Sequence, residues 1–287
     1  MDAAARAHRR LTGGGWGTPA RYAGLVVASG LTLAPFLWVG TNAFKFFKDI
    51  VQWSWTFEPT LVNFRRVLFE QDISFLRLGV NSLVIALASM AISLVCGALG
   101  AYSLSRFRWS RAVTAFVLGW MLFVHMVPPI TFTGPFFLLA RFFDVYNTYL
   151  PVIAAHTIIT LPVVMWIMKG FFDELPKELE EAAMVDGCNR TGSFLRIALP
   201  LAGPGLGAAA ILAFLFSWNE FLFALTLTST AEATTIPVGV AKFSQEFAIL
   251  YGEMSAASIL ASIPALIFVA VAQKQLLKGL TLGAVKG

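Results

Sequence analysis

Six long apolar segments dominate the pattern of hydrophobic and polar positions along the chain. They cover residues 22–44, 78–103, 112–140, 149–169, 204–228 and 255–273. Most are near the roughly 20 residues that a helix needs to cross a bilayer. The runs are continuous rather than short and alternating, which disfavours a membrane β-barrel. The pattern predicts an all-α, polytopic membrane protein with six transmembrane helices, the third of them kinked at Pro128 and Pro129.

The composition supports a membrane location. Of 287 residues, 57% are hydrophobic and 13% are charged, whereas soluble domains carry about 25% charged residues. The net charge of +5 lies in short basic blocks between apolar runs, which is typical of membrane orientation and not of nucleic-acid binding. Gly13, Gly14 and Gly15 follow the first basic residues, and no cleavage site follows the first apolar run, so we interpret that run as a retained span. Cys96 and Cys188 fall in a span and a cytoplasmic loop, and we expect no disulfide between them.

The lysines and arginines between the apolar segments predict the orientation of the chain. With the N-terminus inside, the cytoplasmic set is Arg6, Arg9, Arg10, Arg21, Arg106, Arg108, Arg111, Lys169, Lys177, Arg190, Arg196, Lys274, Lys278 and Lys286. The outside set is Lys45, Lys48, Arg65, Arg66, Arg77, Arg141 and Lys242. The excess in the first set favours cytoplasmic N- and C-termini. The predicted parts are an N-terminal segment at 1–21, a transmembrane domain at 22–277 and a C-terminal tail at 278–287.

A hydrophilic stretch at residues 170–203 is too long for a mere connection, and loops of this length tend to be functional. Pro176 favours a helix start, because the N–H that proline lacks would be unpaired at the first helical position. Residues 177–186 are rich in helix formers, and Gly187 is a plausible stop. A second short segment covers residues 190–199 and ends at Pro200. We expect a compact knob below the membrane.

The first of these short helices has two faces at 100° per residue. One face holds Leu175, Leu179, Ala182 and Ala183, whereas Lys177, Glu180 and Glu181 lie opposite, with Met184 among them. An exposed methionine within a charged face indicates a docking surface. Periodicity alone equally permits an amphipathic helix on the membrane surface, or a solvated connection.

Further residues carry a resemblance to a known family. The run Glu181-Ala182-Ala183-Met184-Val185-Asp186-Gly187, followed by Phe194, Ile197, Leu199 and Pro200, resembles the "EAA" loop of bacterial ABC importer permeases. Asn81-Ser82, Pro128-Pro129, Trp218-Asn219-Glu220-Phe221 and the tail at 278–287 are similar to its maltose-type, carbohydrate branch. Cys188 departs from this pattern, since the family usually has alanine there.

The resemblance implies a permease subunit in a bacterial inner membrane. Its partners would be a homologous permease subunit, two ATP-binding subunits and an extracytoplasmic solute-binding protein. The loop at about 173–200 would fit a cleft on the ATPase and transmit its closure to the spans. The resemblance assigns this coupling role to Glu181, Ala182, Ala183, Met184, Asp186, Gly187, Leu199 and Pro200.

The sequence has no motif for catalysis. It lacks a Gly-x-x-x-x-Gly-Lys-Ser/Thr phosphate loop, a nucleophile elbow, a His-Glu-x-x-His helix and any Cys/His cluster with metal-ligand spacing. We therefore expect no cofactor, no metal and no ATP hydrolysis on this chain. The energy source would come from a partner.

Glu220 is the one acidic residue well inside a predicted span, and such residues usually face a cavity or a partner. With Ser217, Trp218 and Asn219 it offers carboxylate, hydroxyl, indole and amide groups that suit a sugar in a translocation path. The alternative is that Glu220 and Asn219 hold helices together. Asn81 could bond a neighbouring helix or face the path.

Three function classes fit these observations to different degrees. The first is a sugar-type ABC permease. The second is an ion-coupled secondary transporter in which Glu220 and His125 carry a proton, although we see no clear inverted repeats. The third is a membrane-embedded enzyme, which the missing catalytic groups disfavour. For His125 and His156, hydrogen-bonded packing is the simpler interpretation.

Overall fold

The computed structural model describes residues 17–70, 74–244 and 249–283. Its helices are α2 (Gly17–Ala43), α3 (Phe47–Val51), α4 (Val62–Phe69), α5 (Phe75–Arg106), α6 (Arg111–Met126), α7 (Ile130–Phe142), α8 (Tyr149–Glu174), α9 (Lys177–Val185), α10 (Arg190–Ser193), the π-helix η1 (Phe194–Ala198), α11 (Leu199–Leu201), α12 (Gly203–Trp218), α13 (Leu222–Leu227), α14 (Ile236–Ala241) and α15 (Tyr251–Gly283). Apart from one isolated bridge between Ser244 and Ile249, no β-structure occurs in the described ranges, which confirms the all-α prediction.

Four described helices are long and apolar enough to cross a membrane: Pro19–Ala43, Phe75–Arg106, Tyr149–Glu174 and Tyr251–Ala272. Two bent pairs raise the number to six if each counts as one span. The predicted N-terminal segment is described only from Gly17, and the predicted tail only up to Gly283, where α15 ends. The rest of both segments lies outside the described residues.

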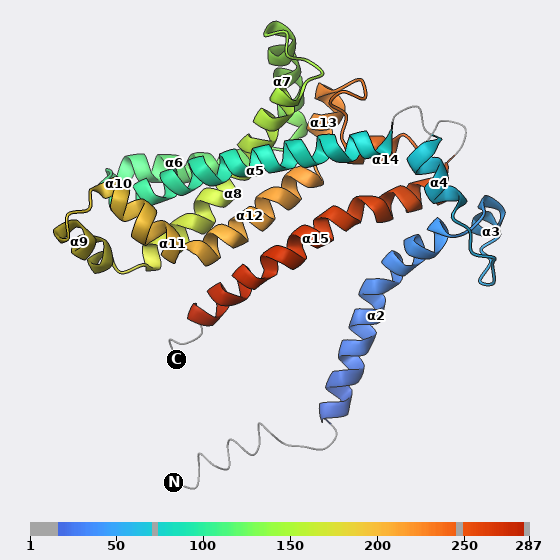
Figure 1. Cartoon of the computed structure of the whole chain (residues 1–287), viewed down its shortest axis with the longest axis horizontal. Coiled ribbons are helices and arrows are strands. Elements are labelled where there is room, and N and C mark those ends of the chain that lie inside the picture. The colour runs from blue at the N-terminus through green and yellow to red at the C-terminus, as the bar shows by residue number, and fades with distance from the viewer. Residues whose placement is uncertain (1–16, 71–73, 245–248, 284–287) are drawn as a thin grey trace.

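The predicted third span breaks at Pro128 and Pro129. Helices α6 and α7 meet there at 98°, because two successive prolines remove two backbone donors and cannot continue the preceding helix. The kink is therefore larger than the bend of one continuous helix. Figure 1 shows α7 projecting away from the bundle that α5, α6, α8 and α12 form.

Helices α5 and α8 form the largest helix–helix contact of the described chain. The two backbones come close at Gly97, where an added Cβ would lie only 2.6 Å from Val164 Cγ1. Ser93 and Thr160 share a buried hydrogen bond of 2.6 Å across the same interface. Small residues and hydroxyl pairs of this kind replace the hydrophobic driving force that is missing between helices in lipid.

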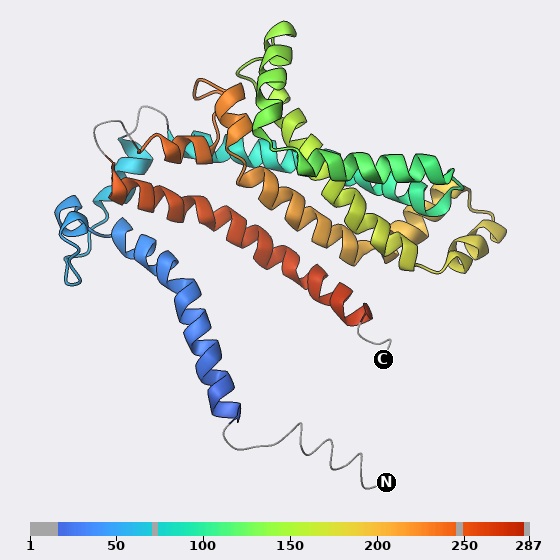
Figure 2. The same cartoon turned by 180° about the vertical axis from the view of Figure 1, so that it is seen from behind.

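Apolar side chains also cover much of the outer surface. Residues 19–37 of α2 are exposed, including Leu25, Leu31 and Phe36 at 62%, 72% and 71%. Figures 1 and 2 show α2 splayed away from the bundle, with α15 between them. A lone helix that is apolar on all sides is stable in lipid and not in water.

The short helices gather at the two ends of the bundle. In Figure 1, α9, α10 and α11 lie at one end, together with the end of α5 and the start of α6. Helices α3, α4 and α14 lie at the opposite end. The predicted cytoplasmic loop at 170–203 and the predicted outer stretches at 45–77 and 229–254 therefore lie towards opposite ends of the bundle.

Candidate functional site

The first candidate site is the knob formed by α9, α10, η1 and α11. The sequence predicted Pro176 as the first helical residue of α9. In the structure Pro176 is the N-cap residue, and the helix begins at Lys177. At the other end, Gly187 has φ 92°. Its N–H donates to Met184 O (3.2 Å) and the Cys188 N–H donates to Ala183 O (3.0 Å). These bonds form a Schellman motif, whose left-handed residue favours glycine. The predicted helix stop at Gly187 is confirmed.

The predicted second helix is longer than expected. From Arg190 the chain runs through α10, η1 and α11 to Leu201, so Pro200 does not end it. Pro200 instead lies in α11, which continues directly from η1. The next helix, α12, follows at a bend of 75°.

The structure corrects the prediction for the two faces of α9. Glu180, expected on the charged outer face, is buried with 6% exposure. Leu179, expected on the opposite face, points outward with 46% exposure, and Val185 is 87% exposed. Met184 is 41% exposed, as expected. Periodicity failed because it assumes that apolar residues face the protein, whereas a charged partner on α5 draws Glu180 inward.

Two side chains of α5 hold Glu180. Arg106 Nε donates to its Oε1 at 2.6 Å, and Tyr102 Oη donates to its Oε2 at 2.5 Å. Arg106 also donates through Nη2 to Leu175 O at 3.0 Å. The Arg106 and Glu180 side chains are only 9% and 8% exposed. Nothing in the sequence spacing links the two residues, so the sequence predicts no ion pair here, and Arg106 indicates only the orientation of the chain.

The residues with a predicted coupling role lie on or beside this knob. Glu181, Ala182, Met184, Asp186, Gly187 and Pro200 are exposed, and Ala183 and Leu199 are half-buried. Val185 and Leu179 of α9 are exposed as well. We call Leu179, Glu181, Ala182, Met184 and Val185 the docking face.

The second candidate site is a break in the predicted fifth span. Helix α12 ends at Trp218, residues 219–221 are not helical, and α13 begins at Leu222. The prediction of one helix over 204–228 is therefore wrong at this point. The physical reason is local, because the Glu220 carboxylate accepts from the Phe223 N–H (2.9 Å) and the Ala224 N–H (3.2 Å) and so caps the new helix.

His156 of α8 connects this break to the neighbouring helix. One ring nitrogen, Nδ1, lies 2.7 Å from Ser217 Oγ, and the other, Nε2, lies 3.0 Å from Glu220 Oε2. The His156 side chain is fully buried, and that of Glu220 is 12% exposed. His156, Ser217 and Glu220 therefore form one polar cluster between α8 and the break.

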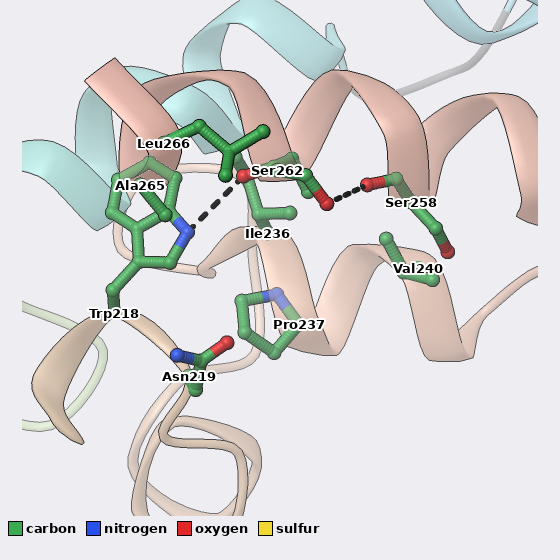
Figure 3. Close-up of a pocket in the computed structure, with 10 residues that line it drawn as sticks. Trp218, Asn219, Ile236, Pro237, Val240, Ser258, Ser262, Ala265 and Leu266 are labelled. Carbon is green, nitrogen blue, oxygen red and sulfur yellow. Dashed lines mark hydrogen bonds between the residues drawn. The ribbon is translucent and has the colours of Figure 1, made fainter. Parts of the chain in front are cut away.

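The predicted polar strip of residues 217–220 divides between two directions. Trp218 turns to α15 and donates through Nε1 to Ala261 O at 3.2 Å, in a pocket of about 430 Å³ shown in Figure 3. Asn219 lines this pocket, and also a second one of about 420 Å³ that includes Glu220 and His125. Ser217 and Glu220 face His156. The structure thus brings Asn219, Glu220 and His125 to one cavity and leaves Trp218 elsewhere.

Asn81 lies apart from both cavities. Its Nδ2 donates to Ala231 O (2.9 Å) and Thr234 O (2.8 Å), and its Oδ1 accepts from Tyr149 Oη (2.6 Å). With 1% exposure, Asn81 fixes the outer segment after α13 to α5.

Cys96 and Cys188 are free, in agreement with the expectation of no disulfide. Within the described ranges, no three His, Cys, Asp or Glu side chains are close enough to share a metal ion.

Comparison with known proteins places this architecture in context. Residues 93–281 match a protein family described as binding-protein-dependent transport system inner membrane component. The sulfoquinovosyl glycerol transport system permease protein of Agrobacterium fabrum is 32% identical over 277 residues, which cover 94% of this chain and 95% of that protein. The trehalose transport system permease protein of Mycobacterium tuberculosis is 35% identical over 265 residues, covering 90% of this chain and 94% of the relative.

A solved structure shares the fold. It is a crystal structure of a bacterial ABC transporter involved in the import of the acidic polysaccharide alginate. One of its chains aligns with a TM-score of 0.75 and 21% identity, covering 93% of this chain and 97% of that chain.

Proposed function

Because the chain belongs to the family of inner membrane components of binding-protein-dependent transport systems, we propose that its cargo is a sugar or a sugar-like solute. The chain is a multi-pass membrane protein and the permease subunit of an ABC importer. The two relatives named above transport a sulfoquinovosyl glycerol and trehalose, both of which contain a glycosidic unit. None of these similarities supports the alternative of an ion-coupled secondary transporter.

ATP hydrolysis takes place on separate subunits in this proposal. Two ATP-binding subunits, a homologous permease subunit and an extracytoplasmic binding protein complete the complex. The docking face of α9 is the observation that supports docking to a separate ATPase subunit. Helix α9 has nine residues. It buries Glu180 and exposes Leu179, Met184 and Val185. Such an exposed apolar surface suits a hydrophobic cleft on a partner.

The N- and C-termini are cytoplasmic in this proposal. The basic turn that contains Arg106, Arg108 and Arg111 joins α5 to α6 at the same end of the molecule as α9. Because positive residues favour the cytoplasmic side, this end faces the ATPase. The opposite end, with α3, α4 and α14, faces the binding protein.

Solute passes beside the break between α12 and α13 in this proposal. The cavity of about 420 Å³ presents the polar groups of Glu220, Asn219 and His125 next to Phe132 and Phe136. Carboxylate and amide groups can bond sugar hydroxyls, and aromatic rings can stack on the apolar face of a pyranose.

Import of labelled glycosides into liposomes that contain the assembled transporter tests the proposed cargo. ATP hydrolysis in the same liposomes tests the docking of α9 to the ATPase. We expect Glu181→Lys to abolish the stimulation of ATP hydrolysis by the loaded binding protein, because it places a positive charge where the docking face meets the ATPase. Glu174→Lys makes the same charge change at the exposed end of α8, off the docking face, and serves as the control. Normal stimulation in Glu181→Lys would contradict docking at α9.

A further inference from the structure

The loop between α2 and α4, which contains α3, carries many aromatic side chains. Figures 1 and 2 show α3 beside the end of α2 and away from α5, α8 and α12. The two ends of the loop are joined, because the Thr60 N–H donates to Phe44 O at 2.9 Å and Asn63 Nδ2 donates to Lys45 O at 2.8 Å. These bonds fix the loop against the end of α2. We call residues 44–60 the aromatic loop.

The middle of the aromatic loop folds back onto the side of α2. The ring centroids of Trp53 and Trp55 lie 5.4 and 5.9 Å from that of Trp38. Lys45 is only 2% exposed, and its Nζ lies 5.0 Å from the centroid of Trp38 and 4.8 Å from that of Phe57. Trp38 lies about one and a half turns before the end of α2. The Trp53 and Trp55 rings are therefore level with the last turns of α2.

Trp53 occupies a backbone position that favours glycine. Its φ is 54°, and it is the left-handed residue of a Schellman motif that ends α3. In this motif the Trp53 N–H donates to Ile50 O at 3.2 Å and the Ser54 N–H donates to Asp49 O at 3.0 Å. A bulky residue in this conformation is strained, and such strain is concentrated at functional positions. The strain indicates that the tryptophan ring itself has a role.

The aromatic loop exposes apolar side chains and gathers its charged ones elsewhere. Four large apolar side chains are 56% to 84% exposed: Phe47, Val51, Trp53 and Trp55. We call these four the anchor residues. Lys48, Asp49 and Glu58 instead line a separate hollow of about 430 Å³. Exposed tryptophans beside charged groups are typical of segments that lie at a membrane–water interface.

We propose that the aromatic loop is an interfacial anchor, whose anchor residues insert into the lipid headgroup region at the end of α2. Lipid is the occupant of this surface because the two tryptophans lie level with a helix that is long and apolar enough to cross a membrane. A tryptophan ring is stable at this depth, since its apolar body meets acyl chains while its N–H donates to a polar group. Helix α2 is exposed along residues 19–37, so the anchor sets its depth and tilt from the lipid side.

Spin labels on single cysteines test the depth of the loop. The assembled transporter is reconstituted in vesicles of phosphatidylethanolamine and phosphatidylglycerol, with Cys96 and Cys188 replaced by alanine. Val51→Cys reports on the anchor, Leu31→Cys on the middle of α2 and Glu58→Cys on the charged hollow; all three positions are exposed. Collisions of the label with oxygen are frequent in lipid, whereas collisions with a water-soluble nickel chelate are frequent in water.

We expect the label at Val51 to lie at a depth between those at Leu31 and Glu58. Its accessibility to the nickel chelate should be roughly tenfold lower than that at Glu58, because the apolar layer excludes water-soluble chelates. An accessibility equal to that at Glu58 would place the loop in water and overturn the anchor. Shielding from both oxygen and the chelate would mean that protein covers this surface, either another permease subunit or the binding protein, and would overturn the anchor as well.

Replacement of the tryptophans tests whether their rings hold the loop in the membrane. In Trp53→Ser with Trp55→Ser, the label at Val51 should lose most of its protection from the chelate. The control, Phe142→Ser with Phe143→Ser, removes two aromatic side chains of 80% and 65% exposure at the end of α7 and should leave the label at Val51 unchanged. Full protection in the tryptophan variant would contradict the role of the two rings. The measurement in the chain that keeps both tryptophans decides the depth even where this variant fails to assemble.

Discussion

Replacement of Glu220 by leucine tests how the break between α12 and α13 is held to α8. The substitution removes the 3.0 Å contact with His156 Nε2 and the two acceptor bonds from the Phe223 and Ala224 N–H groups. Hydrogen bonds to a charged group contribute about 1.5–3 kcal/mol each. The lower value applies here, because the Glu220 side chain is 12% exposed and water can partly replace its partners.

Three such bonds total about 4.5 kcal/mol. The additional apolar surface of leucine recovers on the order of 1 kcal/mol. A net loss of about 3–4 kcal/mol corresponds, at roughly 2–4 °C per kcal/mol, to a fall of roughly 6–16 °C in the apparent midpoint of thermal unfolding. We therefore expect less assembled complex after mild heating.

The measurement is the amount of complex that survives a series of temperatures, as determined by size-exclusion chromatography. Glu220→Gln keeps a carbonyl oxygen for one backbone N–H group and should lie between leucine and the unchanged protein. Ser217→Ala removes one neutral bond to His156, about 1 kcal/mol, and is the matched control. A Glu220→Leu midpoint no lower than that of Ser217→Ala would refute the reasoning.

Other substitutions test the fold and the knob. Gly97→Ala should lower the unfolding midpoint, because its Cβ would meet the stiff Val164 side chain at 2.6 Å, an overpacking cost of about 1–3 kcal/mol. The midpoint should recover in the double variant with Val164→Ala. Gly100→Ala should lower the midpoint less, since its Cβ meets only the flexible end of Met165. Gly187→Val forces a β-branched residue to φ 92°, so ATP hydrolysis stimulated by the binding protein should fall while Gly187→Asn keeps most of it. Asn147→Ala should expose the outer segment to proteolysis, because the Asn147 Oδ1 accepts from the Ser229 and Thr230 N–H groups and a residue at φ 61° favours asparagine over alanine.

The sequence predicted those parts of the fold that depend on local chemistry. Proline pairs and glycines act on their own backbone, so Pro128 and Pro129 predict a kink in the third span, and Gly187 predicts the end of α9. Hydropathy found the apolar segments, but it located their ends poorly. Helix α8 continues to Glu174 beyond the predicted end at 169, where the exposed pair of Lys169 and Asp173 joins successive turns at 2.6 Å.

The parts of the candidate sites that the sequence missed depend on tertiary contacts. Glu180 and Arg106 are far apart in the chain, and neither the charge pattern nor the helical period of α9 relates them. The break at 219–221 has a local cause, but no proline or glycine marks it, since the Glu220 carboxylate caps α13 by accepting from the Phe223 and Ala224 N–H groups. His156, found only as an isolated residue in a span, gains its role when α8 packs beside that break.

The energetics of α9 explain why its docking face stays exposed. A helix of nine residues is too short to be stable alone in water, so α9 depends on its Schellman ending and on the bonds from Tyr102 and Arg106 to Glu180. These bonds orient the helix with its carboxylate inward, which necessarily turns Leu179, Met184 and Val185 outward. Swapping the two faces would bury three apolar side chains, but it would leave Arg106 as an unpaired charge in a nearly dry site, a penalty of about 3–5 kcal/mol. The bonds from Tyr102 and Arg106 to Glu180 therefore favour the orientation that exposes apolar surface.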